Sequence, residues 1–380
     1  MAKKNTAGEA LALHKKLGGK LRIEPAMKVK NRADLSLIYT PGVAAVSTFV
    51  AKNKEKTREY TMKGRMVAVI SDGSAVLGLG NIGPEGALPV MEGKAALFKV
   101  FADIDAVPIV LATQEPERIV EAVCNIAPGF GGINLEDIAA PKCFEIERMI
   151  IERLDIPVMH DDQHGTAIVV LAGIINALKV VKKKIEDVHI IISGAGAAGT
   201  AVAYLLRAAG AQHIVALDSK GIIGIHRLDL TRHKTELAGF TNPEDIAGGL
   251  RDALVKADVL VGVSGPGLAT ASDIRLMNKD AIVFAMANPV PEIMPDEAKK
   301  GGAAVIATGR SDFPNQVNNS LAFPGIFRGA LDNRVVRITE EMKFNAAKAL
   351  AALVPKPTAQ KILPDMFDKR VVKAVAKVIR

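Results

Sequence analysis

Two pairs of adjacent carboxylates are the groups in this sequence best suited to chemistry. Asp161 and Asp162 follow a short apolar run in IPVMHDDQHGTA, and Glu136 and Asp137 follow another in GGINLEDI. Neighbouring acids repel each other unless a cation or hydrogen bonds neutralise them. Because strand ends of an open α/β sheet share one crevice, we expect both pairs to converge there and bind Mg²⁺ or Mn²⁺. The alternative is that each pair simply caps the helix that follows it.

A glycine-rich turn downstream predicts a dinucleotide site. A β-branched run, 188–192, leads into SGAGAAG, a helical stretch and a second strand that ends at Asp218. The glycines allow a tight turn and close approach of the backbone to a pyrophosphate. An acid at the second strand end bonds the ribose hydroxyls and favours NAD, although Lys220 could offset this by neutralising the 2′-phosphate of NADP. The predicted cofactor residues are Gly194, Gly196, Ala197, Ala198, Gly199, Asp218 and Asn288.

Asparagines follow later apolar strands and could bind a small polar substrate. Asn288 lies in ANPVPE, and Asn318 and Asn319 lie in PNQVNNS. Such loops line the nicotinamide side of a cleft in this class of fold. The alternative is ordinary turn chemistry, for which asparagine is common.

A lysine and a tyrosine complete the set of candidate catalytic groups. The glycine-rich stretch SDGSAVLGLGNIGPEGALPVMEGK is predicted to be a loop, with a helix that begins at Lys94, and Tyr39 precedes the turn formed by Pro41 and Gly42. A rigid turn fixes the direction of the tyrosine. The alternatives are a solvated lysine and a packed tyrosine.

These residues require an α/β fold with more than one domain. The 380 residues are 49% hydrophobic and contain no tryptophan, and short β-branched runs alternate with helical stretches. That alternation predicts parallel sheets covered by helices. We expect an N-terminal α/β domain for substrate and metal (residues 1–163), a Rossmann-type dinucleotide domain (164–340) and C-terminal helices that pack back on the body (341–380). His160–Asp162 is predicted to be a turn, and Lys220–Asp245 to be irregular.

Composition argues against several other classes of protein. The formal charge is +8, but the basic residues are scattered and aromatic residues make up only 4%, unlike a nucleic-acid platform. Two cysteines give no disulfide framework. The polar start and the absence of a long uncharged apolar run predict neither a signal peptide nor a membrane span. We expect a cytoplasmic protein.

Seven ordered blocks of this sequence resemble the malic enzymes, in their shorter prokaryotic form. The blocks are YTPGVA, LGLGNIGPEGALPVMEGK, NLEDI, HDDQHGTA, GAGAAG, ANPVPE and NNSLAFPGI. The family oxidises malate with NAD or NADP and decarboxylates the product to pyruvate, using Mg²⁺ or Mn²⁺. The resemblance therefore implies an oxidoreductase, and we expect a homodimer.

The resemblance also assigns roles to residues of this chain. It implies Glu136, Asp137 and Asp162 as metal ligands with Asp161 beside them, Lys94 as general base and Tyr39 as general acid, and Asn288 and Asn319 as substrate contacts. A cation near an amine lowers its pKa, which suits Lys94 as a base.

One position departs from the family, and other functions remain open. The larger eukaryotic members have an arginine for a malate carboxylate where this chain has Ala75. The competing interpretations are a malolactic or simple hydroxy-acid dehydrogenase on the same scaffold, and a nucleotide-binding regulator without catalysis.

Overall fold

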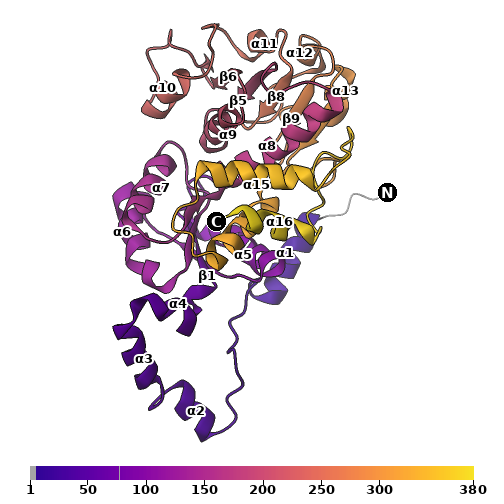
Figure 1. Ribbon diagram of the computed structural model, residues 1–380. Helices are drawn as coiled ribbons and strands as arrows, with labels where there is room; N and C mark the ends of the chain where they lie inside the picture. The colour runs from indigo at the N-terminus through magenta and orange to yellow at the C-terminus, as the bar shows by residue number, and fades with distance from the viewer. Residues whose placement is uncertain (1–5, 77) are drawn as a thin grey trace.

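The computed structural model describes residues 6–76 and 78–380, which form two mainly parallel β-sheets connected by one long helix (Figure 1). The first sheet has the order β2-β1-β3-β4. Its strands are β1 (Met66–Ser71), β2 (Asp105–Val110), β3 (Gly132–Leu135) and β4 (Val158–His160).

Helices cover both faces of this sheet. Along β1, Val67 and Val69 face one core, which includes α5 (Gly83–Ala102), while Ala68 and Ile70 face another, which includes α6 (Pro116–Ile126) and α7 (Lys142–Arg153). Side chains alternate along a strand, so an uninterrupted apolar run such as MVAVI fits a sheet buried on both sides.

The second sheet has the strand order of a dinucleotide-binding fold. It reads β10-β9-β8-β5-β6-β7, with only β7 antiparallel. The order reverses between β5 and β8, which is where such sheets bind ligands. The strands are β5 (His189–Ser193), β6 (His213–Asp218), β7 (Gly221–Ile222), β8 (Val259–Gly262), β9 (Ile282–Ala285) and β10 (Val305–Thr308); the helices are α9 (Ala197–Ala208), α10 (Arg232–Ala238), α11 (Leu250–Ala253), α12 (Ala271–Ile274) and α13 (Pro295–Lys300).

The prediction of an irregular stretch after Asp218 was therefore partly wrong. That stretch contains β7 and α10. The strand β7 is only two residues long and α10 only seven, so neither has the periodic apolar pattern that reveals a longer element.

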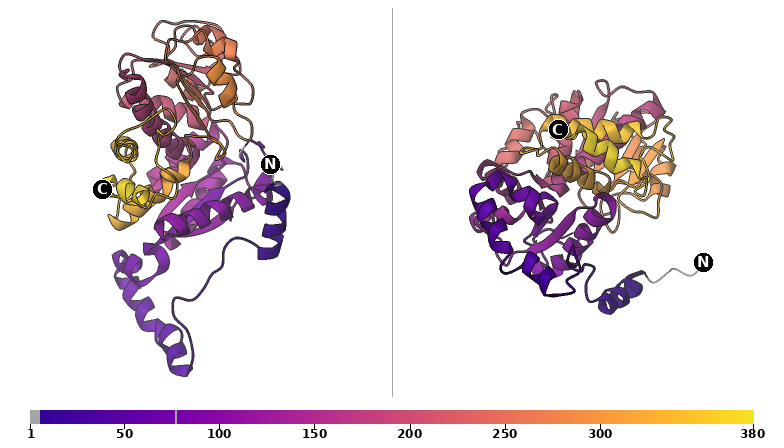
Figure 2. Two further views of the ribbon diagram at one scale, coloured as in Figure 1. Left: turned by 90° about the vertical axis from the view of Figure 1, so that its right-hand side faces the viewer. Right: turned by 60° about the horizontal axis from the view of Figure 1, so that its bottom comes forward.

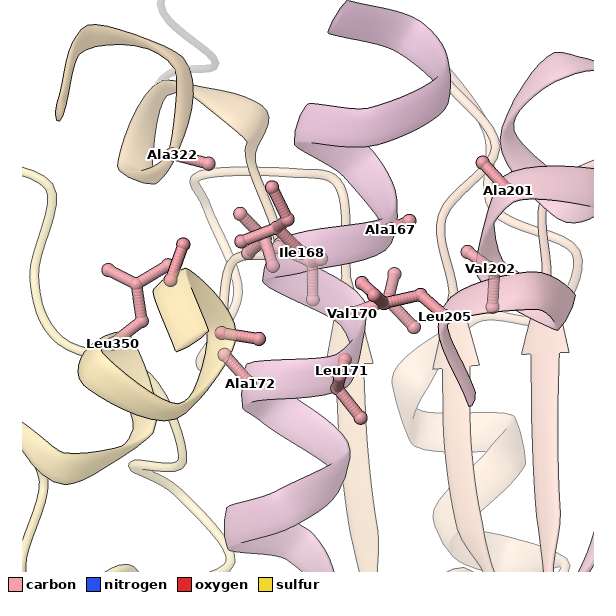
Figure 3. Close-up of a cluster of buried hydrophobic side chains, with 14 of the residues drawn as sticks. Ala167, Ile168, Val170, Leu171, Ala172, Ala201, Val202, Leu205, Ala322 and Leu350 are labelled. Atoms are coloured by element: carbon pink, nitrogen blue, oxygen red, sulfur yellow. The ribbon is translucent and has the colours of Figure 1, made fainter. Parts of the chain in front are cut away.

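Helix α8 (Asp161–Val181) is the central element of the molecule. It begins directly after β4, and its apolar side chains pack against α9 and against α15 (Glu340–Ala352), as Figure 3 shows. Burying each valine, leucine or isoleucine contributes about 1.5–3 kcal/mol. The remaining C-terminal elements are the 3₁₀ turn η4 (Asn319–Leu321), α14 (Phe323–Asp332) and α16 (Arg370–Val378).

The N-terminal helices have a different environment. None of the residues of α1 (Thr6–Leu17), α2 (Arg32–Ile38) or α3 (Val43–Lys52) is buried. Helices α2 and α3 extend away from the body as an arm in both side views (Figures 1 and 2). The arm returns through η1 (Lys54–Lys56), α4 (Thr57–Tyr60) and η2 (Met62–Gly64), and η3 (Ala127–Gly129) precedes β3.

Two described segments have the length and apolar composition of a membrane-spanning helix, Arg32–Lys52 and Asp161–Val181. The second is α8, most of which is buried between other elements. The first is not one helix but α2 and α3, separated by the turn at Tyr39–Gly42. A buried core helix such as α8 satisfies the same criteria, and the other segment is two short helices, so both are weak evidence for a membrane span.

Candidate active site

The two acidic pairs follow neighbouring strands. Leu135 and His160 are partners in the parallel register of β3 and β4, so the residues after them emerge at the same sheet edge. The predicted turn at His160–Asp162 was wrong, because α8 begins at Asp161. Acids in the first turn of a helix are stabilised by its free N–H groups, which lets the helix start without a linker.

Three carboxylates form a cluster at this edge. Oxygens of Glu136, Asp137 and Asp162 all lie within 4.8 Å of one another. The Asp137 N–H donates to Asp162 Oδ2 at 2.8 Å, and Asn134 Nδ2 donates to Glu136 Oε2 at 2.9 Å. The cluster has the oxygen-donor composition that Mg²⁺ and Mn²⁺ prefer.

Lys94 lies beside this cluster. The prediction of a helix that begins at Lys94 was wrong, because α5 begins at Gly83 and Lys94 lies within it. The Lys94 side chain is only 7% exposed, and its Nζ lies 2.6 Å from Asp161 Oδ2 and 2.8 Å from Glu136 Oε1. The ammonium also lies 4.2 Å from the centre of the Phe323 ring. Burial alone lowers the pKa of Lys94, but the carboxylates of Asp161 and Glu136 outweigh burial and raise it. In this charge environment the lysine is protonated.

The buried carboxyl groups around Lys94 have pKa values above those of free carboxylic acids. Burial raises the pKa of Glu136, Asp161 and Asp162, and mutual repulsion adds to it, while Lys94 lowers each one. One ammonium therefore does not balance the negative charge that these acids carry when ionised. A divalent cation would, so the residues present fit the predicted metal.

Asp161 is held in a tight space. A Cβ on Gly165 would lie 1.8 Å from Asp161 Oδ1, so only glycine fits one turn later in α8. The same added Cβ would lie 3.2 Å from the Asn319 Cβ, which places Asn319 close to Asp161. Asp161 thus contacts Lys94 and lies outside the cluster of three carboxylates.

Glu147, on α7, forms hydrogen bonds to residues at the start of α8. Its buried carboxylate accepts hydrogen bonds from the backbone N–H of His160 (2.7 Å) and from Gln163 Nε2 (3.2 Å), and contacts His164 Nε2 at 3.0 Å. Sequence reasoning missed Glu147, because a glutamate within a charged helical stretch looks like a solvated residue.

A cleft of about 730 Å³ opens above these groups. Its lining includes all three clustered acids, Lys94, Ala75, Asn288, Asn318 and Asn319. The glycine-rich loop approaches the second sheet closely, since a Cβ on Gly78 would lie 2.0 Å from the Asn288 carbonyl oxygen. Asn318 accepts a hydrogen bond from Ser320 N at 2.9 Å and caps η4, so of the two asparagines Asn319 is the one left to face a substrate.

The structure does not bring Tyr39 to this cleft within one chain. Tyr39 is 66% exposed at the end of α2, on the projecting arm, and the described residues that line the cleft include none from α2 or α3. Figures 1 and 2 show the arm on the far side of the first sheet's helices from the second sheet.

The glycine-rich turn after β5 forms a second hollow, of about 650 Å³. Gly194 has φ +118°, and a Cβ there would lie 2.6 Å from the Val263 carbonyl oxygen; a Cβ on Gly199 would lie 1.7 Å from the Gly194 carbonyl oxygen. No atom lies within 4 Å of a Cβ on Gly196, so the backbone there is open to a ligand. Ala197 and Ala198 begin α9, whose N–H groups can bind an anion.

Asp218 lines this hollow, but its carboxylate already has partners. Arg227 Nη1 lies 2.7 Å from Oδ1 and Lys234 Nζ lies 2.6 Å from Oδ2. Burial raises the pKa of Asp218, but the hydrogen bonds from these two cations outweigh burial and lower the pKa to about 2. Lys220, expected to offset Asp218, instead pairs through Nζ with Asp229 at 2.7 Å. Sequence reasoning missed Lys234, which lies 16 residues from Asp218 on α10.

Comparison with known proteins agrees with this geometry. The malic enzyme NAD-binding domain matches residues 163–379, and the malic enzyme N-terminal domain matches residues 18–117. The bifunctional malic/malolactic enzyme of Bacillus subtilis is 54% identical over 374 residues, covering 98% of this chain and 91% of that protein. The NAD-dependent malic enzyme of Geobacillus stearothermophilus is 51% identical over 377 residues, covering 99% and 78%.

A solved structure gives the same result for the fold. The NAD-dependent malic enzyme of Thermotoga maritima superimposes with a TM-score of 0.95 at 49% identity, covering 97% of this chain and 98% of that one. Since the family models, the relatives and the fold agree across nearly the whole chain, this protein belongs to the malic enzyme family, in its short prokaryotic form.

Proposed function

We propose that this malic enzyme oxidises malate at C2 with NAD(P), and decarboxylates the product to pyruvate, through Lys94 and the acids around it. The observation that carries the proposal is the placement of a buried lysine within 2.8 Å of Glu136 and Asp161, at a cleft lined from the other side by the dinucleotide fold. A proton acceptor and a hydride acceptor therefore flank one space.

The first step moves a proton and a hydride from malate. Lys94 Nζ accepts the proton of the C2 hydroxyl as the C2 hydride leaves for the nicotinamide. When bound by Glu136, Asp137 and Asp162, a divalent cation supplies a Lewis acid for the C2 oxygen and positive charge that lowers the pKa of Lys94. Asp161, at 2.6 Å, keeps Nζ directed at the substrate.

The second step breaks the bond between C3 and C4. Carbon dioxide leaves, and the electron pair of that bond forms enolpyruvate, whose C3 must then take up a proton. Asn288 and Asn319, which line the cleft, would donate hydrogen bonds that orient the substrate.

We assign the final proton to Tyr39 of a second copy of the chain. The arm that carries Tyr39 exposes large apolar side chains, which favours burial against a partner. A symmetric homodimer would cover this surface and would allow each arm to reach the other chain's cleft. The exposed side chains are Leu35, Leu37, Ile38, Val46 and Phe49.

For the cofactor we propose NAD in preference to NADP, with a small margin. Asp218 repels a 2′-phosphate, but Arg227 and Lys234 already neutralise much of its charge. We also propose a cytoplasmic location, because the two cysteines, Cys124 and Cys143, are both free.

A malolactic reaction is the second candidate, and the name of the Bacillus subtilis relative favours it. In that reaction the enzyme would return the hydride to C2 of pyruvate and release lactate. The experiment that tests both is a spectrophotometric assay with malate, Mg²⁺ or Mn²⁺ and each dinucleotide, followed by quantification of pyruvate and lactate. Stoichiometric NADH and pyruvate support the proposal, and lactate without net NADH supports the malolactic reaction. No turnover of malate would contradict both.

A further inference from the structure

Malate carries two carboxylates, and the cleft has few cations to receive them. In the described part of the chain, the basic residues that line the cleft are His14, Lys20 and Lys94. Lys94 is already paired with Glu136 and Asp161. Ala75, also in the lining, offers no charge. Within one chain, the basic side chains of the lining that are left for a free carboxylate are therefore those of the N-terminal segment, His14 and Lys20.

Lys20 is built into the wall of the cleft. The Gly19 backbone has φ +112°, which turns the chain toward α5, and the Lys20 N–H donates to Glu92 Oε2 at 3.0 Å. Lys20 Nζ donates to the Pro89 carbonyl oxygen at 2.6 Å. It lies 3.9 Å from where a Cβ on Gly93 would be, which places the ammonium beside this turn of α5.

The Lys20 ammonium lies beside Gly93, the residue that precedes the proposed base, Lys94. Pro89 and Gly93 lie on one stripe of α5, and Lys94 lies on the adjacent stripe; all three line the cleft. An ammonium has three donors, and the bond to Pro89 uses one of them. Two donors remain for an anion in the cleft.

We propose that Lys20 binds the C4 carboxylate of malate and so selects dicarboxylate substrates. The inference rests on the proposed function, because it assigns C1 and the C2 hydroxyl to the side of the acid cluster. A partly exposed lysine suits this carboxylate, which loses its charge when CO₂ leaves. A fully buried ion pair would stabilise the ground state and oppose that step.

The test measures ligand binding without turnover. Calorimetric titration of malate into the enzyme with Mn²⁺ but no dinucleotide reports affinity, since no hydride acceptor is present. Lys20→Ala is expected to raise the dissociation constant of malate roughly 10- to 100-fold, the scale of a charge-assisted hydrogen bond. Lys20→Arg should stay within a few-fold of wild type. Lys16→Ala, which removes an exposed lysine of α1, is the matched control and should change nothing.

Oxalate separates the two ends of the substrate. It can chelate a metal but has no carbon chain to reach Lys20, so its affinity should be nearly the same in wild type and Lys20→Ala. In steady-state assays the KM for malate should rise far more than kcat falls, with the KM for NAD unchanged. Unchanged malate affinity, or equal losses for malate and oxalate, would overturn the role of Lys20. An inactive wild type would instead contradict the proposed function.

Discussion

Leu135 and His160 face each other as the last register partners of the parallel strands β3 and β4. This pairing brings Glu136 next to Asp161, although they are 25 residues apart in the chain. Lys94 bridges them from the helix above, with Nζ within 2.8 Å of both. Parallel pairing thus assembles the acidic part of the site, and one lysine from α5 forms ion pairs with two of its acids.

Removing one acid from the cluster should separate metal binding from folding. Asp162→Asn is expected to abolish Mn²⁺ binding and lower activity by at least about 10³-fold, while NAD still binds. Without metal, the variant should be more stable than wild type, with a Tm about 2–4 °C higher for ~1 kcal/mol of relieved repulsion. Thermal denaturation in chelator and in Mn²⁺ measures both effects. Glu186→Gln, at an exposed acid, is the control; full activity of Asp162→Asn in chelator would show that the acids are structural.

Lys94 should be essential for oxidation and less so for decarboxylation. Lys94→Ala is expected to lose roughly 10²–10⁴-fold or more in malate oxidation, while supplied oxaloacetate is still decarboxylated, because its hydroxyl proton has already gone. The measurement is the ratio of the two rates in the variant and in wild type. A small external amine should partly restore oxidation.

The control for Lys94 keeps the positive charge. Lys94→Ala leaves Asp161 and Glu136 buried without their cation, and this loss can lower the free energy of unfolding by about 3–5 kcal/mol. Lys94→Arg retains the charge but cannot act as a base near neutral pH, so it should fold and still fail to oxidise malate. Equal losses in oxidation and decarboxylation would mean that Lys94 positions the substrate instead.

Much of the fold and of the acidic site could be predicted from the sequence, for a physical reason. Strands buried on both sides read as apolar runs, and parallel strands place their carboxyl ends at one edge. Locating the acids after those runs was therefore enough to predict their convergence. Two of the glycines of SGAGAAG could be predicted equally well, because close backbone contacts at Gly194 and Gly199 leave no room for a side chain.

Residues that act from a distance could not be predicted this way. Glu147 reaches the start of α8 from the middle of α7, and Lys234 reaches Asp218 from α10. Such contacts depend on how helices pack across the sheets, which local patterns do not encode. Lys20 reaches the cleft through a turn at Gly19, and nothing in its neighbours distinguishes it from the other lysines of the segment.

Glu147 should stabilise the protein in a pH-dependent way. Burial raises the pKa of Glu147, but His164 and Lys343 outweigh burial. The net result is a pKa of about 2 in the folded protein, compared with the ordinary value of 4.5. A lowered pKa stabilises the fold above pH 4.5, and this contribution falls as pH drops from 4.5 toward 2. Relative to Glu147→Gln, the advantage in unfolding free energy should be on the order of 2–3 kcal/mol at pH 6 and roughly 1 kcal/mol smaller at pH 4. Urea denaturation of both proteins measures this; a pH-independent difference would contradict it.

The charges around Asp218 should determine cofactor preference. Asp218→Ser is expected to raise the ratio of kcat/KM for NADP to that for NAD by about tenfold or more, because it frees Arg227 and Lys234 for the 2′-phosphate. Lys234→Ala should lower that ratio. Lys220→Ala should have little effect, since Lys220 pairs with Asp229. An unchanged ratio in Asp218→Ser would show that this acid does not select the cofactor.

Mixing two inactive variants tests whether Tyr39 acts across a dimer. A Tyr39→Phe chain keeps Lys94, and a Lys94→Arg chain keeps Tyr39. If each cleft combines Lys94 of one chain with Tyr39 of the other, a mixed dimer has one intact site and one site lacking both groups. Co-refolded 1:1 mixtures should then recover about a quarter of wild-type activity, because about half of random dimers are mixed. If both groups came from the same chain, every site would lack one of them and the mixture would stay as inactive as its parents. Mixing either variant with itself is the control, and light scattering checks that the mixtures are dimeric.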